Sequence, residues 1–247
     1  MKKFILILIL ILAAFLRLWH LGSVPPSASM DEASIGYNAY SVTKTGIDEY
    51  GTFPLISQRA YDDWRRSTYL LLVVPFVALL NLQVVAVRLP AVILSVVTVW
   101  ATYRTVYALF LKKTERAHFA ALLASFLLAI SPWHIYISRL GHESNAYLSF
   151  FVLGALFFLE GIKIKQKLFV ALLFFALSLI SYYAGQVIVP LFGLGLLFVY
   201  RKVLVSIVTS NIKMFFMACI SFSLFIPVLW SVFSPQALIR FQGTSTF

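Results

Sequence analysis

The chain has 247 residues, of which 61% are hydrophobic and only 12% are charged. A soluble domain carries about 25% charged residues, so this composition excludes an ordinary soluble fold and predicts an all-α polytopic membrane protein. The net charge of +11 would suit a nucleic-acid-binding protein. However, the basic residues form short clusters between apolar runs, which is typical of cytoplasmic loops, and nucleic acid is therefore excluded as a partner.

Apolar runs recur along nearly the whole chain, and a spanning helix needs about 20 such residues. We expect about seven transmembrane helices, at roughly 4–21, 88–110, 117–137, 145–161, 168–182, 186–200 and 212–233. The first run could also be a cleaved signal peptide. Its length, together with Arg17, Trp19 and His20 at its end, favours a retained helix that ends at the membrane interface.

An eighth apolar run, 68–82, is short for a span and contains Pro75. If this run lies at the outer surface or re-enters, the basic clusters at 112–116, 163–167 and 201–202 share a side with Lys2 and Lys3. The positive-inside rule then places the N-terminus inside. The same rule predicts two short helices in 168–200, with a turn near Tyr182.

We expect one membrane domain, 1–247, with a first outer loop at 22–87 that holds juxtamembrane helices and a second at 131–147. Seven of the nine acidic residues fall in these loops, although acidic residues contribute little to the positive-inside rule. Their concentration on one face therefore predicts a functional site there. They are Asp31, Glu32, Asp48, Glu49, Asp62, Asp63 and Glu143.

The segment that begins at Ser29 reads as a helix. Ser29 and Glu32 have the spacing of a capping box, and Gly46 is a plausible C-terminal stop. Capping accounts for Glu32, and acids in a first turn also favour the helix dipole. Asp31 is less well explained, because one acid already caps the helix. Its position just beyond a span makes it a candidate to meet the headgroup of a lipid-linked substrate.

The second outer loop and the start of the following spans add further candidates. Aromatic residues in 131–147 suit an interface belt, but His134, Arg139, His142 and Glu143 are more than a belt requires. Arg88 lies at the outer start of the 88–110 span, where it would either snorkel to lipid phosphate or bind the phosphate of a substrate. Asp31 with Glu143 could bind a metal ion, but no ligand spacing supports it.

These features carry a resemblance. Three segments resemble the dolichyl-phosphate-mannose protein mannosyltransferases and their bacterial relatives, including the aminoarabinose transferase of lipid A. They are MDEASIGYNAYSVTKTGIDEYG (30–51), AVRLPAVILS (86–95) and SPWHIYISRLGHESN (131–145). These enzymes belong to the GT-C class. The resemblance covers residues 1 to about 200 in the expected order. It is specific for the superfamily and not for one substrate.

The resemblance implies inverting transfer of a sugar from a polyprenyl-phosphate donor to a hydroxyl of a glycan, lipid or protein acceptor at the outer face of a bacterial or archaeal cell membrane. Asp31 would be the general base, with Glu32 as the second acid of the catalytic pair. Arg88 and Arg139 would bind the donor phosphate. No metal or other cofactor is implied. The residues expected to line the site are His142, Glu143, Asp62 and Asp63.

Family members are considerably longer, so the resemblance also implies that a C-terminal part is missing. This leaves open a truncated, non-catalytic membrane scaffold as an alternative. A transporter is a third alternative, but transporters place ionisable groups in the middle of spans and often contain inverted repeats. The spans of this chain are nearly free of ionisable residues in their middle, and no repeat is apparent.

Overall fold

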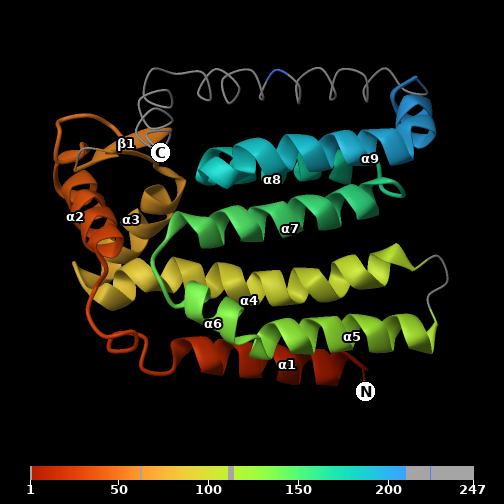
Figure 1. The fold of residues 1–247 in the computed structure, drawn as a ribbon, viewed down its shortest axis with the longest axis horizontal. Coiled ribbons are helices and arrows are strands. Elements are labelled where there is room, and N and C mark those ends of the chain that lie inside the picture. Colours follow the sequence, from red (N-terminus) through yellow and green to blue (C-terminus); the bar gives the residue numbers. More distant parts are fainter. Residues whose placement is uncertain (1, 62, 111–113, 210–222, 224–247) are drawn as a thin grey trace, which may run out of the picture.

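The computed structural model describes residues 2–61, 63–110, 114–209 and 223. Within them the chain is mostly helical, with nine helices and one antiparallel hairpin (Figure 1). The elements are α1 (Lys2–Leu18), α2 (Met30–Thr45), β1 (Ser57–Ala60), β2 (Asp63–Arg66), α3 (Thr68–Leu80), α4 (Val84–Leu109), α5 (Glu115–Ile130), α6 (Pro132–Ser138), α7 (Glu143–Gly161), α8 (Lys167–Ser181) and α9 (Tyr183–Thr209).

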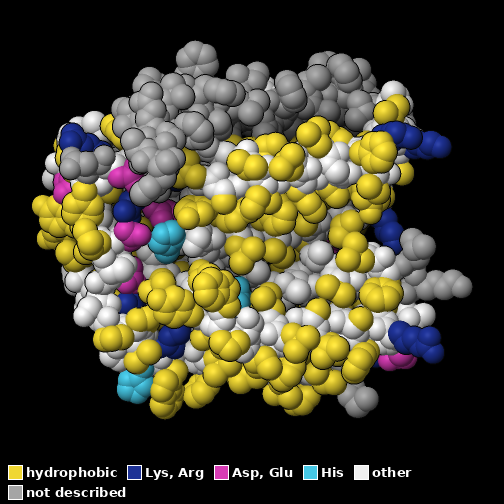
Figure 2. Space-filling model, viewed as in Figure 1, with side chains coloured by type: hydrophobic (Ala, Val, Ile, Leu, Met, Phe, Trp, Pro, Cys, Tyr) yellow, Lys and Arg dark blue, Asp and Glu magenta, His cyan; other side chains and the backbone are white. Residues whose placement is uncertain are grey.

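The long helices lie side by side in a bundle, in which α1 packs on α4 and α5, α4 on α7, and α8 on α7 and α9. At one end of the bundle, which we name the α2 end, α2, the hairpin and α3 gather together (Figure 1). The opposite end, at which α1 begins, we name the basic end. Figure 2 shows Lys and Arg side chains at both ends and most of the Asp and Glu side chains at the α2 end.

Three helices are long and apolar enough to cross a membrane, namely α4, α7 and α9. The pair α5 and α6 would make a fourth span, although it bends by 59°. Helices α1, α8 and α3 are shorter, with 17, 15 and 13 residues. These helices are consistent with the expected membrane protein, and the expected seventh span at 212–233 lies outside the described residues.

Two predictions about breaks between helices agree with the structure. The stretch 168–200 forms two helices, α8 and α9, which meet at Tyr182 in an extended conformation, but α9 is not short, since its 27 residues extend to Thr209. The run 68–82 forms the separate short helix α3, which packs on α2 and α4 at the α2 end (Figure 1). Both features bring the basic clusters of neighbouring helices to the basic end.

Two expectations about local structure were wrong. The fold is mostly helical but not all-α as expected, because β1 and β2, between α2 and α3, pair in a hairpin with Ser57 opposite Arg66. The expected span 117–137 is broken at Ser131, whose ψ is 118°. Pro132 follows it, and a residue before proline avoids the α conformation because of a steric clash with the proline ring.

Arg17, in the last turn of α1, is directed into the protein. It is fully buried, and its Nη1 donates to the carbonyls of Ala13 and Ala129 at 3.0 Å each. Its Nη2 donates to the Leu128 carbonyl at 3.4 Å and to His134 Nδ1 at 2.7 Å. The guanidinium therefore joins the ends of α1 and α5, where helix carbonyls lack partners and favour a cation.

Candidate functional site

The start of α2 sets the position of two adjacent acids. As expected, Ser29 and Glu32 form a capping box, in which the Ser29 N–H donates to Glu32 Oε2 at 2.9 Å and the Glu32 N–H donates to Ser29 Oγ at 3.2 Å. Gly46 ends the helix in the left-handed conformation, with φ of 79°. Glu32 consequently turns inward, whereas Asp31 keeps a side chain that is 30% exposed.

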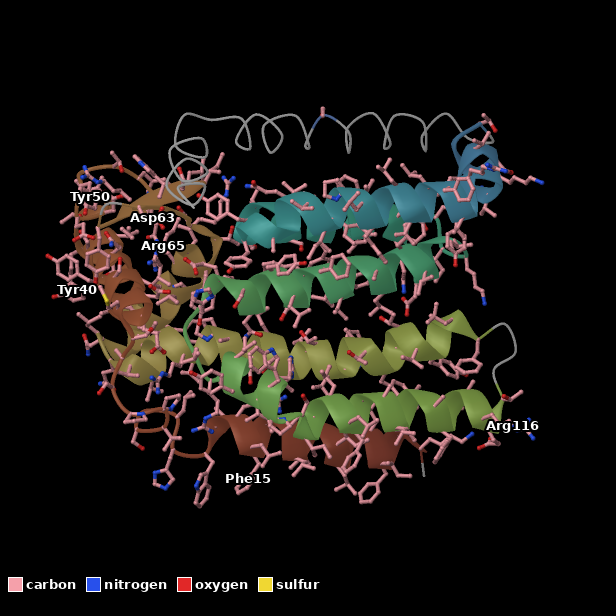
Figure 3. All side chains as sticks on the ribbon, viewed as in Figure 1. Phe15, Tyr40, Tyr50, Asp63, Arg65 and Arg116 are labelled. Atoms are coloured by element: carbon pink, nitrogen blue, oxygen red, sulfur yellow. The ribbon has the colours of Figure 1, made fainter. Side chains whose placement is uncertain are left out.

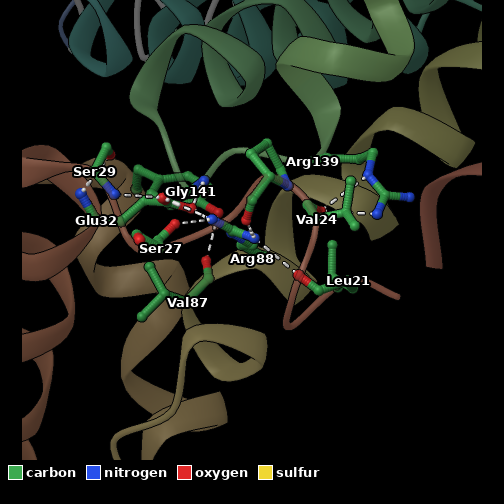
Figure 4. A network of polar contacts seen from close by, with 11 residues as sticks. Leu21, Val24, Ser27, Ser29, Glu32, Val87, Arg88, Arg139 and Gly141 are labelled. Atoms are coloured by element: carbon green, nitrogen blue, oxygen red, sulfur yellow. Dashed lines mark hydrogen bonds and ion pairs between the residues drawn. The ribbon is translucent and has the colours of Figure 1, made fainter. Parts of the chain in front are cut away.

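Glu32 and Arg88 form a buried ion pair beneath the start of α2 (Figure 4). Arg88 Nε donates to Glu32 Oε1 at 2.6 Å, and Nη2 donates to Oε2 at 3.1 Å. The remaining N–H groups donate to the carbonyls of Leu21, Pro25 and Ser27 at 2.8–3.0 Å. All five N–H groups of this fully buried guanidinium are therefore directed at protein atoms.

Arg139 likewise donates hydrogen bonds to backbone carbonyls, here at the end of α1. Its Nη1 donates to the carbonyls of Leu16 and Arg17, and its Nη2 donates to those of Trp19 and Val24 (Figure 4). The residue is only 7% exposed. Phosphate binding by Arg88 or Arg139, as expected from the resemblance, would require these contacts to open. In this structure both side chains instead order the segment that joins α1 to α2.

The pKa of Glu32 follows from this network. Burial alone would raise it, but hydrogen bonds from Arg88, Ser29 and Gly141 outweigh burial and hold the pKa below its ordinary value. A carboxyl with a lowered folded-state pKa stabilises the fold fully above its unfolded-state pKa. That contribution is lost as the pH falls through the folded-state pKa.

We therefore expect the difference in free energy of unfolding between the wild type and Glu32→Gln to be constant near neutral pH. It should shrink as the pH falls from the ordinary carboxyl pKa toward the lowered folded-state pKa, because the unfolded state then binds a proton at Glu32 that the folded state does not. Unfolding in mixed micelles at a series of pH values measures this difference. A difference that stays constant down to acid pH would contradict the assignment.

Gly141 lets the segment between α6 and α7 approach this pair. Its N–H donates to Glu32 Oε1 at 3.0 Å, and an added Cβ would lie 2.7 Å from Val87 Cγ1 and 3.1 Å from the Val87 carbonyl oxygen. The backbone of α4 cannot move aside easily. The loop therefore requires glycine here because of a close approach and not because of an unusual φ.

Gly141→Ala is expected to lower the free energy of unfolding by about 1–3 kcal/mol, the usual cost of overpacking. Gly193→Ala is the matched control, since an added Cβ there meets nothing within 4 Å and alanine is the better helix former. Thermal unfolding in detergent compares the two variants. Equal midpoints for both would show that the loop adapts without cost.

Next to this buried pair lies a cleft of about 70 Å³ that opens at the α2 end. Elements from four parts of the chain contribute to it: the start of α2, the strand β2, the start of α7 and the turn between α8 and α9. The residues that line it are Asp31, Arg65, Arg66, His142, Glu143, Ser181, Tyr182 and Tyr183.

His142 lies between the two acids of the cleft. It caps α7, because the Ser144 N–H donates to His142 Nδ1 at 3.1 Å. Nδ1 is therefore the acceptor, and the proton of the neutral ring is assigned to Nε2. That atom lies 3.4 Å from Asp31 Oδ2 and 3.5 Å from Glu143 Oε2. An N–H group thus faces both carboxylates.

Of these two acids, Glu143 has an oxygen atom without a hydrogen-bond partner. Its side chain is only 5% exposed, and its Oε1 has no hydrogen-bond partner in the described part of the chain. A buried polar atom without a partner is costly, and such atoms are rare in native proteins. Oε1 is therefore available to accept a hydrogen bond from a group that enters the cleft.

Two arginines in the cleft were missed from the sequence. Arg65 forms an ion pair with Asp31, and Arg66 lies over the ring of Tyr183 at 5.0 Å. Burial alone would lower the pKa of Arg65, but Asp31, with help from Glu143, raises it above its ordinary value. Both arginines stay cationic. Their presence in a loop that was expected to lie outside departs from the positive-inside rule, and this departure was the available signal.

The other acids between α1 and α3 accept hydrogen bonds from nearby residues of the same segment. Asp48 accepts from the backbone N–H groups of Tyr50 and Thr52 at 3.0 and 2.9 Å. Glu49 accepts from the Asn38 amide at 2.8 Å. Asp63 Oδ1 accepts from the backbone N–H of the next residue in β2. None of these three lines the cleft, and Asp62 lies outside the described residues.

Asp31, His142 and Glu143 are therefore the expected site residues that the structure brings together, whereas Glu32, Arg88 and Arg139 lie behind them. Together with Arg65 and Arg66, they place carboxylates and cations around a space that substrate groups can enter. No protein-family model, curated protein or solved structure matches this chain, so the chemistry of the cleft rests on its own residues.

Proposed function

We propose that this chain is a membrane glycosyltransferase that moves a sugar from a polyprenyl-phosphate donor to an acceptor hydroxyl at the α2 end. The observation that carries the proposal is the cleft, in which Asp31 and Glu143, whose Oε1 has no described partner, lie together with Arg65 and Arg66. Inverting transfer needs a carboxylate at the attacking hydroxyl and cations at the leaving phosphate.

Asp31 is the general base in this proposal. It accepts the proton of the acceptor hydroxyl while the hydroxyl oxygen bonds to the anomeric carbon from the face opposite the phosphate. The bond between that carbon and the phosphate oxygen breaks, and the electron pair leaves with the phosphate. Arg65 moves from Asp31 to the phosphate, which frees the carboxylate and stabilises the negative charge that develops.

Glu143 and His142 position the reactants. The free Oε1 of Glu143 accepts a hydrogen bond from a substrate hydroxyl. The Nε2–H of His142 holds the Asp31 carboxylate in position. The cleft volume of about 70 Å³ corresponds to roughly two water molecules. It therefore admits the reacting groups, while the sugar ring and the lipid chain lie at its mouth.

The proposal also keeps the GT-C-like arrangement of seven spans, with the N-terminus inside and the α2 end outside. We expect single cysteines at Tyr61 and Lys165, in a variant that lacks Cys219, to react with a membrane-impermeant maleimide from opposite sides. Both positions are exposed in the structure. Labelling of intact and opened spheroplasts measures the sides, and labelling of both positions from one side would overturn the topology.

The test of function is sugar release from radiolabelled polyprenyl-phosphate-mannose and polyprenyl-phosphate-glucose by the full chain in liposomes. Release that depends on Asp31 supports the transferase and begins to name the donor. Movement of labelled donor or solute into vesicles without sugar release supports a transporter instead. Absence of release and flux with every donor and acceptor class supports the non-catalytic scaffold.

A further inference from the structure

An apolar groove of about 420 Å³ runs between α1 and α5, away from the cleft. Its volume falls within the range of about 300–1,000 Å³ that is usual for small-molecule sites. Every residue that lines it is hydrophobic: Ile5, Leu8, Ile9, Leu12, Phe119, Leu122, Leu123 and Phe126. Figure 2 shows hydrophobic side chains along these two helices.

Polar contacts hold the two helices together on either side of this groove. Near the α2 end, Arg17 donates to carbonyls at the end of α5, and the small Ala13 and Ala129 are fully buried. At the basic end, Lys2 forms an ion pair with Glu115. Between these contacts the large side chains keep the helices apart, so the groove is a property of the fold.

Cations lie at the mouth of the groove at the basic end. Arg116 precedes Phe119 by three residues and Leu123 by seven, so the helical repeat places it on the groove face of α5. Figure 3 shows Arg116 at this end. Arg116 is exposed and forms no ion pair with any described residue, and Lys2 lies at the same end in its ion pair with Glu115.

We propose that this groove binds an anionic phospholipid of the leaflet at the basic end, with one acyl chain between α1 and α5 and the phosphate on Arg116. An apolar groove with a cationic mouth matches an acyl chain joined to a phosphate. The site is remote from the cleft and does not depend on the proposed transferase. The polyprenyl donor would act at the opposite end of the bundle.

A second copy of the chain fits this surface less well. Two copies in one membrane have the same orientation, so a twofold interface along α1 and α5 would bring Arg116 of both copies to the same level. Like charges that meet this way repel. The cations at the mouth therefore favour an anionic lipid as the occupant.

The experiment uses the full chain in nanodiscs that contain phosphatidylglycerol or phosphatidylcholine with the same photoreactive acyl chain. We expect cross-links in 5–12 and 119–126, with phosphatidylglycerol preferred. Arg116→Gln should reduce cross-linking of phosphatidylglycerol about fivefold, the effect of one cation near an anionic surface. Leu8→Trp should reduce it for both lipids by filling the groove.

Arg201→Gln and Leu197→Trp are the matched controls on the exposed face of α9, and both should leave cross-linking in the groove unchanged. Arg116→Gln changes an exposed side chain, so it tests the proposal even if Leu8→Trp fails to fold. Equal cross-linking of the two lipids, equal losses in Arg116→Gln and Arg201→Gln, or cross-linked dimers through α1 and α5 would each overturn the proposal.

Discussion

Asp31→Asn is expected to abolish sugar transfer while the protein still folds and binds the donor lipid. The amide keeps the size of the side chain but cannot take the proton of the acceptor hydroxyl. General-base catalysis contributes about 10²–10⁴-fold to a rate, so kcat should fall by this factor. Because the variant still lines the cleft, KM for the donor should change much less. Initial rates at a series of donor concentrations separate the two effects.

The control for this variant is Glu115→Gln, which makes the same chemical change at an exposed carboxylate of the basic end. It should transfer sugar at the wild-type rate. If Asp31→Asn turns over nearly as fast as the wild type, Asp31 is not the base. Glu143 is then the next candidate, because it is the other carboxylate in the cleft.

Arg88→Met is expected to lower the free energy of unfolding by about 3–5 kcal/mol, the largest loss of stability that we predict for a single substitution. The variant leaves Glu32 ionised and buried, with only the N–H groups of Ser29 and Gly141 as donors. It also removes the donors to three carbonyls of the segment between α1 and α2. Unfolding in mixed micelles measures the loss.

The double variant Glu32→Gln/Arg88→Met distinguishes a lost ion pair from lost packing. Since it removes the buried charge as well as its partner, it should be more stable than Arg88→Met alone. Arg201→Met is the matched control for the change from arginine to methionine, and it should stay within about 0.5 kcal/mol of the wild type. A double variant no more stable than Arg88→Met would assign the loss to the carbonyl contacts.

The helices that could be predicted are those whose signals are local. The capping box of Ser29 and Glu32 and the stop at Gly46 fix α2 within a single segment, and the basic clusters on either side of 168–200 indicate the turn at Tyr182. The hairpin of β1 and β2 could not be predicted in this way. Its eight residues show no alternation of apolar and polar side chains, and only tertiary pairing makes them strands.

The site was predictable only in part, because a side chain's partners come from distant segments. Asp31 was recognised because its neighbour already caps the helix, and Glu143 because it lies in an outer loop. Arg88 appeared suited to phosphate from its place at the start of a span. Its real partners, Glu32 and the carbonyls before it, precede it by 56–67 residues. No local pattern reveals that its N–H groups are already occupied.

Arg139 has a consequence for how the chain is made. It follows the α1 carbonyls that it binds by about 120 residues of sequence. Synthesis runs from the N-terminus, so the segment after α1 leaves the ribosome before the five helices α2 to α6 are made. Only when Arg139 arrives can that segment, and with it the base of α2, take its final shape. Assembly of the cleft is therefore a late event in biogenesis, and chains arrested before Arg139 should expose residues 19–29 to protease.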